Sequence, residues 1–238
     1  FRMKNKLNNL YNANREVKFA LVGAGKMGKG LVNQLSRIKG LTSSVVIDEK
    51  PEKAMEALIS SGVRKSDITT SDNIKIIENS IKNGMYVVSD DYSIACKLQD
   101  IKGVVDATGN PPFGAILAME AIENRKHTIM LNVECDAVIG PYLFNLAKKK
   151  NVIYTGSAGD EPGAIMELAD FALGAGFKLL AVGKGKNNPL NHYITEDEVR
   201  EEAISKGLYP KMLAGFIDGT NTMIELTSAA NALGFVPK

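Results

Sequence analysis

Short apolar runs alternate with segments of helical periodicity through roughly the first two thirds of the chain. The first run, Val17–Val22, is followed by Met27, Leu31, Val32 and Leu35, which are spaced as on one helix face. The predicted strands are 17–22, 45–47, 85–88, 104–107, 128–133 and 152–155, and the predicted helices between them are 27–35, 51–58, 69–82, 94–101, 112–124 and 139–150. This alternation is typical of a parallel sheet covered by helices on both faces, a doubly wound α/β fold.

The pattern changes at Gly156–Gly163, where small and acidic residues replace the strands and helices. We place a domain boundary there, which gives domains 1–156 and 157–238. In the second domain we predict a helix over 163–173, a strand over 178–182, a helix opened by the capping box Thr195–Glu198, and a last helix over 220–233. The chain ends soon after that helix, with no strand for it to pack on. We therefore expect this smaller α/β domain to be incomplete.

A glycine-spaced turn, Gly23-Ala24-Gly25-Lys26-Met27-Gly28, joins the first strand to its helix. The first glycine permits a tight turn, the second lets the backbone approach a phosphate, and the third lets the helix pack closely. The helix N-terminus then presents N–H groups to the anion. The turn predicts a Rossmann-type dinucleotide site that includes Lys26 and Met27. The alternative is an ordinary glycine turn.

Asp48 ends the second strand and lies 20 residues past Gly28 (48 − 28), where a ribose-binding acid is expected. Such a carboxylate accepts hydrogen bonds from a ribose 2′-OH, which favours NAD. Lys50 follows closely and could neutralise the 2′-phosphate of NADP. The alternative for Asp48 is a cap on the next helix. The residues leave the choice between NAD and NADP open.

Two further segments end strands at the same sheet edge, where ligands bind in open α/β sheets. The predicted cofactor contacts there are Ala107, Thr108, Gly109, Asn132 and Glu134. Ordinary turns between strands and helices would contain the same residue types.

The richest polar cluster follows the boundary. Pro162 fits the first helical position, which makes Glu161 a poor cap and frees it for a substrate or proton-transfer role. Lys184 and Lys186 flank a glycine and could bind an anion or protonate a carbonyl oxygen. Asp160 and Asn188 complete the catalytic candidates, although a solvated loop is the common alternative. Asp218, Asn221 and Glu225 share one helical side, which we interpret as its wet face.

Composition and charge limit the kinds of partner that the chain is expected to bind. The formal net charge of the 238 residues is +2, so no basic excess indicates nucleic acid. Two cysteines and two histidines indicate neither a disulfide framework nor a Cys/His metal site, and we predict no metal. Without a membrane-length apolar stretch or a signal-peptide core, a cytoplasmic protein with a small-molecule substrate is expected. The small residues of Ala172–Gly176 permit, but do not require, a homo-oligomer.

Several segments together resemble the homoserine dehydrogenase-like oxidoreductases, above all the branch that includes the deoxyxylulose-phosphate reductoisomerase-like enzymes. The resembling segments are Gly23–Gly28, Asp106–Pro111, Asn132–Glu134, Tyr154–Gly163, Gly183–Leu190 and Asp218–Thr220. The resemblance implies a Rossmann domain joined to a catalytic domain, NADPH as cofactor, and functional roles for Glu161, Lys184 and Lys186. It also implies a small polar or phosphorylated substrate. Members usually continue past the position of Lys238.

The leading hypothesis is hydride transfer between NAD(P)H and a small carbonyl compound, with a lysine stabilising or protonating the forming alkoxide. The alternative is a non-catalytic dinucleotide-binding sensor or regulatory module, because the chain has no catalytic histidine signature.

Overall fold

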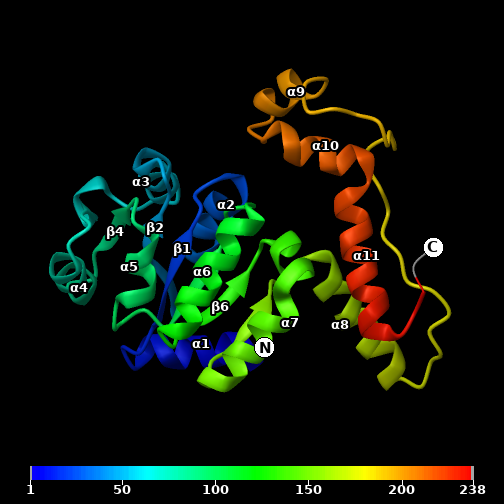
Figure 1. Ribbon diagram of the computed structural model, residues 1–238. Helices are drawn as coiled ribbons and strands as arrows, with labels where there is room; N and C mark the ends of the chain where they lie inside the picture. Colours follow the sequence, from blue (N-terminus) through cyan, green and yellow to red (C-terminus); the bar gives the residue numbers. More distant parts are fainter. Residues whose placement is uncertain (1, 237–238) are drawn as a thin grey trace. The chain divides into compact units, whose positions relative to one another are not determined.

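The computed structural model describes residues 2–236. Phe1, Pro237 and Lys238, which belong to the ends of the two predicted domains, lie outside the described residues. The chain divides into two compact units, Phe1–Thr155 (unit 1, blue to green in Figure 1) and Gly156–Lys238 (unit 2, yellow to red).

Unit 1 alternates strands and helices from its second element onward. Its elements are α1 (Arg2–Asn12), β1 (Val17–Val22), α2 (Lys26–Leu35), β2 (Leu41–Ile47), α3 (Pro51–Ser60), a 3-10 turn (Lys65–Asp67), β3 (Ile68–Thr70), α4 (Ile74–Lys82), β4 (Tyr86–Ser89), α5 (Tyr92–Lys97), β5 (Gly103–Asp106), α6 (Pro111–Glu123), β6 (His127–Met130), α7 (Val133–Lys150) and β7 (Tyr154–Gly156).

The strands of the described residues form one seven-stranded sheet in the order β3-β4-β2-β1-β5-β6-β7. The chain builds outward from β1 to one side and then returns to build the other side from β5. Val22 is in register with Ile47 on one side and with Asp106 on the other, so the carboxyl ends of β1, β2 and β5 meet at one edge. Without the extra edge strand β3, this is the Rossmann order, and ligands of such sheets bind where the strand order reverses, which here is between β1 and β5. The predicted α/β fold is confirmed.

Alternating residues of β1 supply both sides of the core. Ala20 and Val22 pack with α4, α5 and α6 on one face, whereas Phe19 and Leu21 pack with α2 and α3 on the other. A third cluster joins α6 and α7 to β6 and β7. Burial on both faces explains why the strands read as continuous apolar runs rather than as alternating patterns.

Several predicted boundaries in unit 1 are wrong. The predicted helix 69–82 begins too early, because Ile68–Thr70 form the edge strand β3 and α4 starts only at Ile74, after the Asn73 cap. The predicted helix 94–101 ends at Lys97, so Leu98 and Ile101 reach the core from the following loop. The strand β6 ends at Met130, and α7 begins at Val133 rather than near 139, because the Asn132 side chain caps it.

Gly114 in α6 provides a stability test of the packing behind the sheet edge. A Cβ at Gly114 would overlap the Asp106 carboxylate and lie 2.6 Å from Nδ2 of Asn132, both fully buried. We expect Gly114→Ala to lower the free energy of unfolding by about 2–4 kcal/mol in urea denaturation. The control Gly30→Ala, on a helical glycine with no atom near its Cβ position, should raise it by up to about 1 kcal/mol. Equal effects at the two sites would contradict this packing.

Unit 2 is built from helices and loops. Its helices are α8 (Glu161–Gly174), α9 (Arg200–Ser205), α10 (Pro210–Asp218) and α11 (Thr220–Leu233). The last helix matches the predicted bounds, and Gly234 follows it in the left-handed conformation (φ 72°). The predicted strand 178–182 is wrong, because a strand needs a hydrogen-bonded neighbour and the described part of unit 2 pairs none with it. Leu180 is accordingly 83% exposed.

Local signals in unit 2 have specific structural roles. The capping box forms, since Thr195 N donates to Oε2 of Glu198 over 2.8 Å, although the regular helix begins only at Arg200. The small residues of Ala172–Gly176 end α8. Gly176 has φ 84°, and Phe177 N donates to Ala172 O in the 6→1 bond of a Schellman turn. This segment is therefore explained as a helix stop, and the homo-oligomer stays a prediction.

Candidate functional site

The glycine turn after β1 is built so that only glycine fits at its first position. Gly23 has φ +99°, and a Cβ there would lie 2.7 Å from the carbonyl carbon and oxygen of Ala107. Its N–H donates to Ile47 O over 2.8 Å, so the turn is tied to β2 as well. The turn is thereby fixed against the ends of both neighbouring strands.

The other two glycines differ in their surroundings. A Cβ at Gly28 would overlap the carbonyl oxygen of Gly23, so this glycine lets α2 begin directly against the turn. Gly25 is the N-cap of α2, has no side chain to satisfy the first N–H groups, and has no atom within 4 Å of its Cβ position. Lys26 and Met27 in the first turn are exposed. Open backbone N–H groups and free space fit a diphosphate.

Asp48 is buried at the end of β2 and bonds inward. Its Oδ2 accepts from Ala24 N over 2.8 Å, and its Oδ1 accepts from Lys50 N over 3.0 Å. Asp48 therefore braces the glycine turn, while Lys50, exposed, is the N-cap residue of α3. Each carboxylate oxygen can accept a second hydrogen bond, so ribose binding stays compatible with this geometry. The choice between NAD and NADP is not decided by these contacts.

A buried polar network holds the loops after β5 and β6. Asp106 is fully buried, and its Oδ1 accepts from the N–H and the hydroxyl of Thr108 over 2.9 and 2.7 Å. Its Oδ2 accepts from Asn132 Nδ2 over 3.1 Å, and Asn132 Oδ1 accepts from Cys135 N. Asn132 thus caps α7 and holds the loop after β6, and it is 1% exposed. Asp106, which the sequence analysis did not select, organises both loops.

The remaining predicted residues of this edge surround the network. Gly109 is exposed with φ 63°, Ala107 is half-buried, and Glu134 lies half-buried in the first turn of α7. Because the carboxyl ends of parallel strands meet here, the fold brings these residues to the edge that carries the glycine turn. Their contact with a cofactor stays a prediction.

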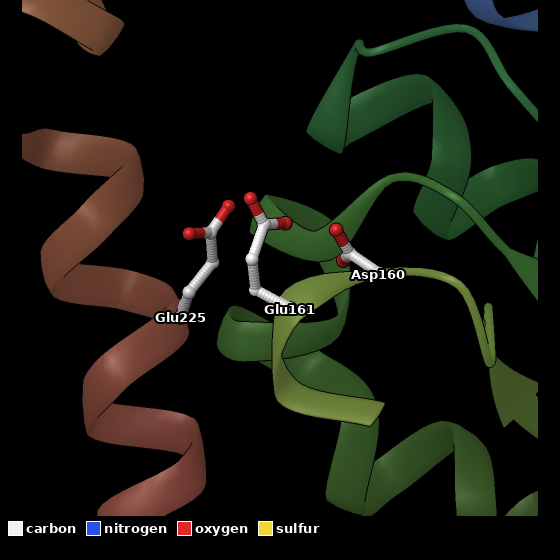
Figure 2. Close-up of side chains that lie close together, drawn as sticks. All are labelled: Asp160, Glu161 and Glu225. Atoms are coloured by element: carbon white, nitrogen blue, oxygen red, sulfur yellow. The ribbon is translucent and has the colours of Figure 1, made fainter. Parts of the chain in front are cut away.

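In unit 2 the Lys184 ammonium lies between two carboxylates. It is 2.7 Å from Oε1 of Glu161 at the start of α8, and it also contacts Oε2 of Glu225 on α11. Figure 2 shows the carboxyl groups of Glu161 and Glu225 turned toward each other. Partial burial lowers the pKa of Lys184, but the hydrogen bonds to both glutamates outweigh this and raise it overall. The ammonium also lowers the pKa of Glu161. Lys184 is therefore protonated at neutral pH.

Glu225 overturns one interpretation of the sequence. The spacing of the last helix places it on the predicted wet face, but it is 6% exposed, whereas Met223 on the same helix is 65% exposed. Helical periodicity shows which residues share a face of the helix. It does not show which face is buried, and the assumption that the face with the apolar residues is buried is wrong here. A buried acid facing a lysine from a distant loop leaves no local sequence signal.

Asp160 is the N-cap residue of α8, so Glu161 is the first helical residue and not the cap, and Pro162 is the second. The Asp160 side chain makes no cap bond, and its Oδ2 is buried without a partner. Burial and the neighbouring Glu161 carboxylate raise the pKa of Asp160 to about 6. The site thus pairs an acid that holds its proton in mildly acidic solution with an ionised glutamate.

The raised pKa of Asp160 predicts a pH dependence of stability. Between about pH 4 and 6 the folded chain keeps a proton on Asp160 that the unfolded chain has lost, so this contribution is present below pH 4 and is lost as pH rises through 6. Relative to Asp160→Asn, the wild-type free energy of unfolding should fall by about 1–2 kcal/mol across this window in urea titrations. The exposed Asp170→Asn should not change the profile. An identical slope in wild type and Asp160→Asn would contradict the assignment.

The other two catalytic candidates lie in the same loop. The Lys186 ammonium donates to Phe216 O near the end of α10, so Lys186 anchors the loop. Asn188 is half-buried in a bend. The structure brings Asp160, Glu161 and Lys184 into one cluster and ties Lys186 to a separate helix end.

Three carboxylates of unit 2 lie close enough together to ligate a cation. Oxygen atoms of Asp160, Glu161 and Glu225 lie within 4.8 Å of one another, and hard divalent cations prefer such ligands. In this structure the Lys184 ammonium supplies the positive charge to two of them. We therefore describe the cluster as an ion-pair network. The prediction of no metal, which rested on scarce Cys and His, stays untested.

Comparison with protein families bears on unit 2. Residues 159–238 match the family model described as "Oxidoreductase DRL, catalytic domain". The matched segment contains Asp160, Glu161, Lys184 and Glu225. It supports the prediction of an oxidoreductase enzyme, and it does not distinguish homoserine dehydrogenase-like from reductoisomerase-like chemistry. No curated protein matches the chain significantly.

One of the matching solved structures shares the fold of this chain. A probable dehydrogenase from Thermotoga maritima has a TM-score of 0.56 at 14% identity, with 92% of this chain and 55% of that chain covered. Two further matches are more distant in structure, each with a TM-score of 0.45. One is an NAD-binding protein from Listeria innocua at 18% identity, with 67% of this chain and 41% of that chain covered. The other is a scyllo-inositol dehydrogenase from Lactobacillus casei with bound NAD(H) at 15% identity, with 66% of this chain and 42% of that chain covered. The chain thus spans about half, or less, of the length of the structures it matches. At 14% identity, the likeness to the Thermotoga maritima dehydrogenase shows the fold alone.

Among the described helices, none combines the length and apolar character required to cross a bilayer.

Proposed function

We propose that this chain is part of an NAD(P)H-dependent oxidoreductase that interconverts a carbonyl group and an alcohol on a small polar substrate. The observation that carries the proposal is the Lys184 ammonium held by Glu161 and Glu225 within the segment that matches an oxidoreductase catalytic domain. The open glycine turn of unit 1 supports a dinucleotide as the second reactant.

The glycine turn would hold the diphosphate through the first N–H groups of α2, and the loops fixed by Asp106 would border the nicotinamide half. When bound, the reduced nicotinamide supplies a hydride to the substrate carbon. Lys184 would donate a proton to the substrate oxygen as the hydride arrives, and the same amine would accept it in the reverse direction. Glu161, 45% exposed at the side chain, would accept a hydrogen bond from a substrate hydroxyl.

The charges of the cluster limit the substrate class. Glu161 and Glu225 against one Lys184 leave a net negative charge, to which Asp160 adds above about pH 6. A phosphate next to these carboxylates would be repelled. We therefore propose that the reacting end of the substrate is an uncharged carbonyl or hydroxyl group, and that any phosphate binds away from this cluster.

The test combines binding and turnover. Calorimetry with NADH and NADPH should give saturable binding of at least one of them. Absorbance of the reduced nicotinamide should then fall with one member of a panel of hydroxy aldehydes and ketones, each tried with and without a phosphate group. Binding without turnover on the whole panel would favour the sensor or regulatory module, and absence of binding by folded protein would refute the proposal.

A further inference from the structure

A buried carboxylate faces Lys184 from the last helix. The Glu225 side chain on α11 is 7% exposed, whereas that of Glu161 on α8 is 45% exposed and that of Lys184 is 20% exposed. Figure 2 shows Glu225 reaching toward the start of α8 from its own helix. The two glutamates that share one ammonium therefore differ strongly in their access to water.

This difference in burial sets the strength of the two contacts. Water screens a charge pair at an exposed carboxylate, so the Glu161 contact is worth little in holding a side chain. An ionised carboxylate as buried as Glu225 needs a cation, and removing either partner leaves an uncompensated charge inside the protein. Among the described residues, Lys184 forms the ion pair with Glu225.

The loop that carries Lys184 depends on such contacts. Residues 178–190 have no regular secondary structure, so no helix or sheet hydrogen bonds fix their path. Lys186 anchors the loop to Phe216 O on α10, and Lys184 anchors it to α8 and α11. Without the Glu225 contact, the Lys184 amine would be held only by the exposed Glu161.

We infer that Glu225 is a positioning residue that fixes the Lys184 ammonium at the reaction site and keeps it charged, an inference that rests on the proposed function of Lys184. Glu225 does not contact substrate or cofactor in this mechanism. It acts through the lysine, as the buried member of a three-residue chain in which Glu161 is the member open to ligands.

The test measures the amine itself and needs no substrate. Trace acetylation of the folded protein with acetic anhydride over a range of pH, followed by mass spectrometry, reports the titration of each lysine. In Glu225→Gln, burial would act on Lys184 with one carboxylate fewer, so its apparent pKa should fall. Its labelling at neutral pH should then rise about tenfold for each pH unit by which the pKa falls. Glu161→Gln should give a smaller change.

Two controls separate this effect from general loosening. The exposed Glu167→Gln on α8 should label Lys184 as wild type does. Within the Glu225→Gln sample, the exposed Lys178 should keep its wild-type rate, whereas an unfolded protein would label every lysine faster. An unchanged Lys184 titration in folded Glu225→Gln would overturn the inference.

A second measurement covers the case in which Glu225→Gln does not fold. The double variant Lys184→Met/Glu225→Gln removes both charges. Its urea denaturation midpoint should therefore lie above that of Glu225→Gln and below that of wild type. No gain over the single variant would overturn the inference.

The two proposals fail differently. In an active enzyme, Glu225→Gln should lower kcat and shift the basic limb of the pH profile to lower pH, with the KM for the dinucleotide unchanged. A wild-type protein without turnover would refute the proposed function and leave the labelling result readable. Unchanged labelling of Lys184 in Glu225→Gln would refute the positioning role of Glu225. It would not affect the proposed function, which predicts a loss of turnover in Lys184 variants.

Discussion

Replacing Lys184 by methionine should lower the turnover of NAD(P)H with a carbonyl substrate by about 10²–10⁴-fold, or about 3–5 kcal/mol of transition-state stabilisation. The reason is the loss of the ammonium that lies between Glu161 and Glu225 and would protonate the forming alkoxide. Dinucleotide affinity should stay at the wild-type value, because the proposed dinucleotide contacts all belong to unit 1. Steady-state kinetics and calorimetry on the same preparation measure both quantities.

Stability must be followed in this experiment, since Lys184→Met leaves the buried Glu225 without its partner and should cost about 1–3 kcal/mol of folding free energy. Lys184→Arg separates the effects. Arginine keeps the ion pairs but holds its proton too tightly to donate it, so stability should be largely retained while turnover falls. The exposed Lys178→Met is the matched control and should behave as wild type. Full turnover in Lys184→Arg would contradict the proton-donor role.

The second large effect concerns the glycine turn. In Gly28→Ala the new methyl group would overlap the Gly23 carbonyl oxygen, a backbone atom that cannot rotate away. We expect the start of α2 to move, dinucleotide affinity to fall at least about tenfold, and the free energy of unfolding to fall by about 2–4 kcal/mol. Calorimetric titration with NADH and NADPH, together with urea denaturation, checks both changes.

Gly25→Ala is the sharper variant of this pair. Gly25 has φ −68° and no atom within 4 Å of its Cβ position, so alanine should be accepted in the free protein with stability within about 0.5 kcal/mol of wild type. A diphosphate resting on the turn would meet the methyl group, so affinity should fall at least about tenfold. Gly30→Ala, farther along α2, should retain affinity. Unchanged dinucleotide affinity in Gly25→Ala would show that the diphosphate does not rest on this turn.

The fold of unit 1 was largely predictable from sequence because its signals are local. Apolar runs of strand length, Pro51 at a helix start and the glycines after Val22 each act within a few residues. Errors arose where a local pattern admits two structures. The predicted helix 69–82 included Thr69 and Thr70, yet these residues belong to the edge strand β3 because β4 offers a hydrogen-bonding partner.

Unit 2 was less predictable for the same physical reason. The run 178–182 has strand composition, but no strand of the described residues lies beside it. A strand is a property of a pair, and composition describes only one member of it.

In the candidate site, too, local features were predictable from sequence and long-range contacts were not. Spacing selected the glycine turn and Asp48, and local rules together with the family resemblance selected Glu161 and Lys184, since rules on turns, caps and phosphate contacts apply to neighbouring residues. Only the tertiary structure decided that Asp48 and Asn132 bond inward, that Lys186 anchors a helix end, and that Glu225 is buried against Lys184. These contacts join residues distant in the chain, and their geometry depends on how whole elements pack, which periodicity within one element does not record.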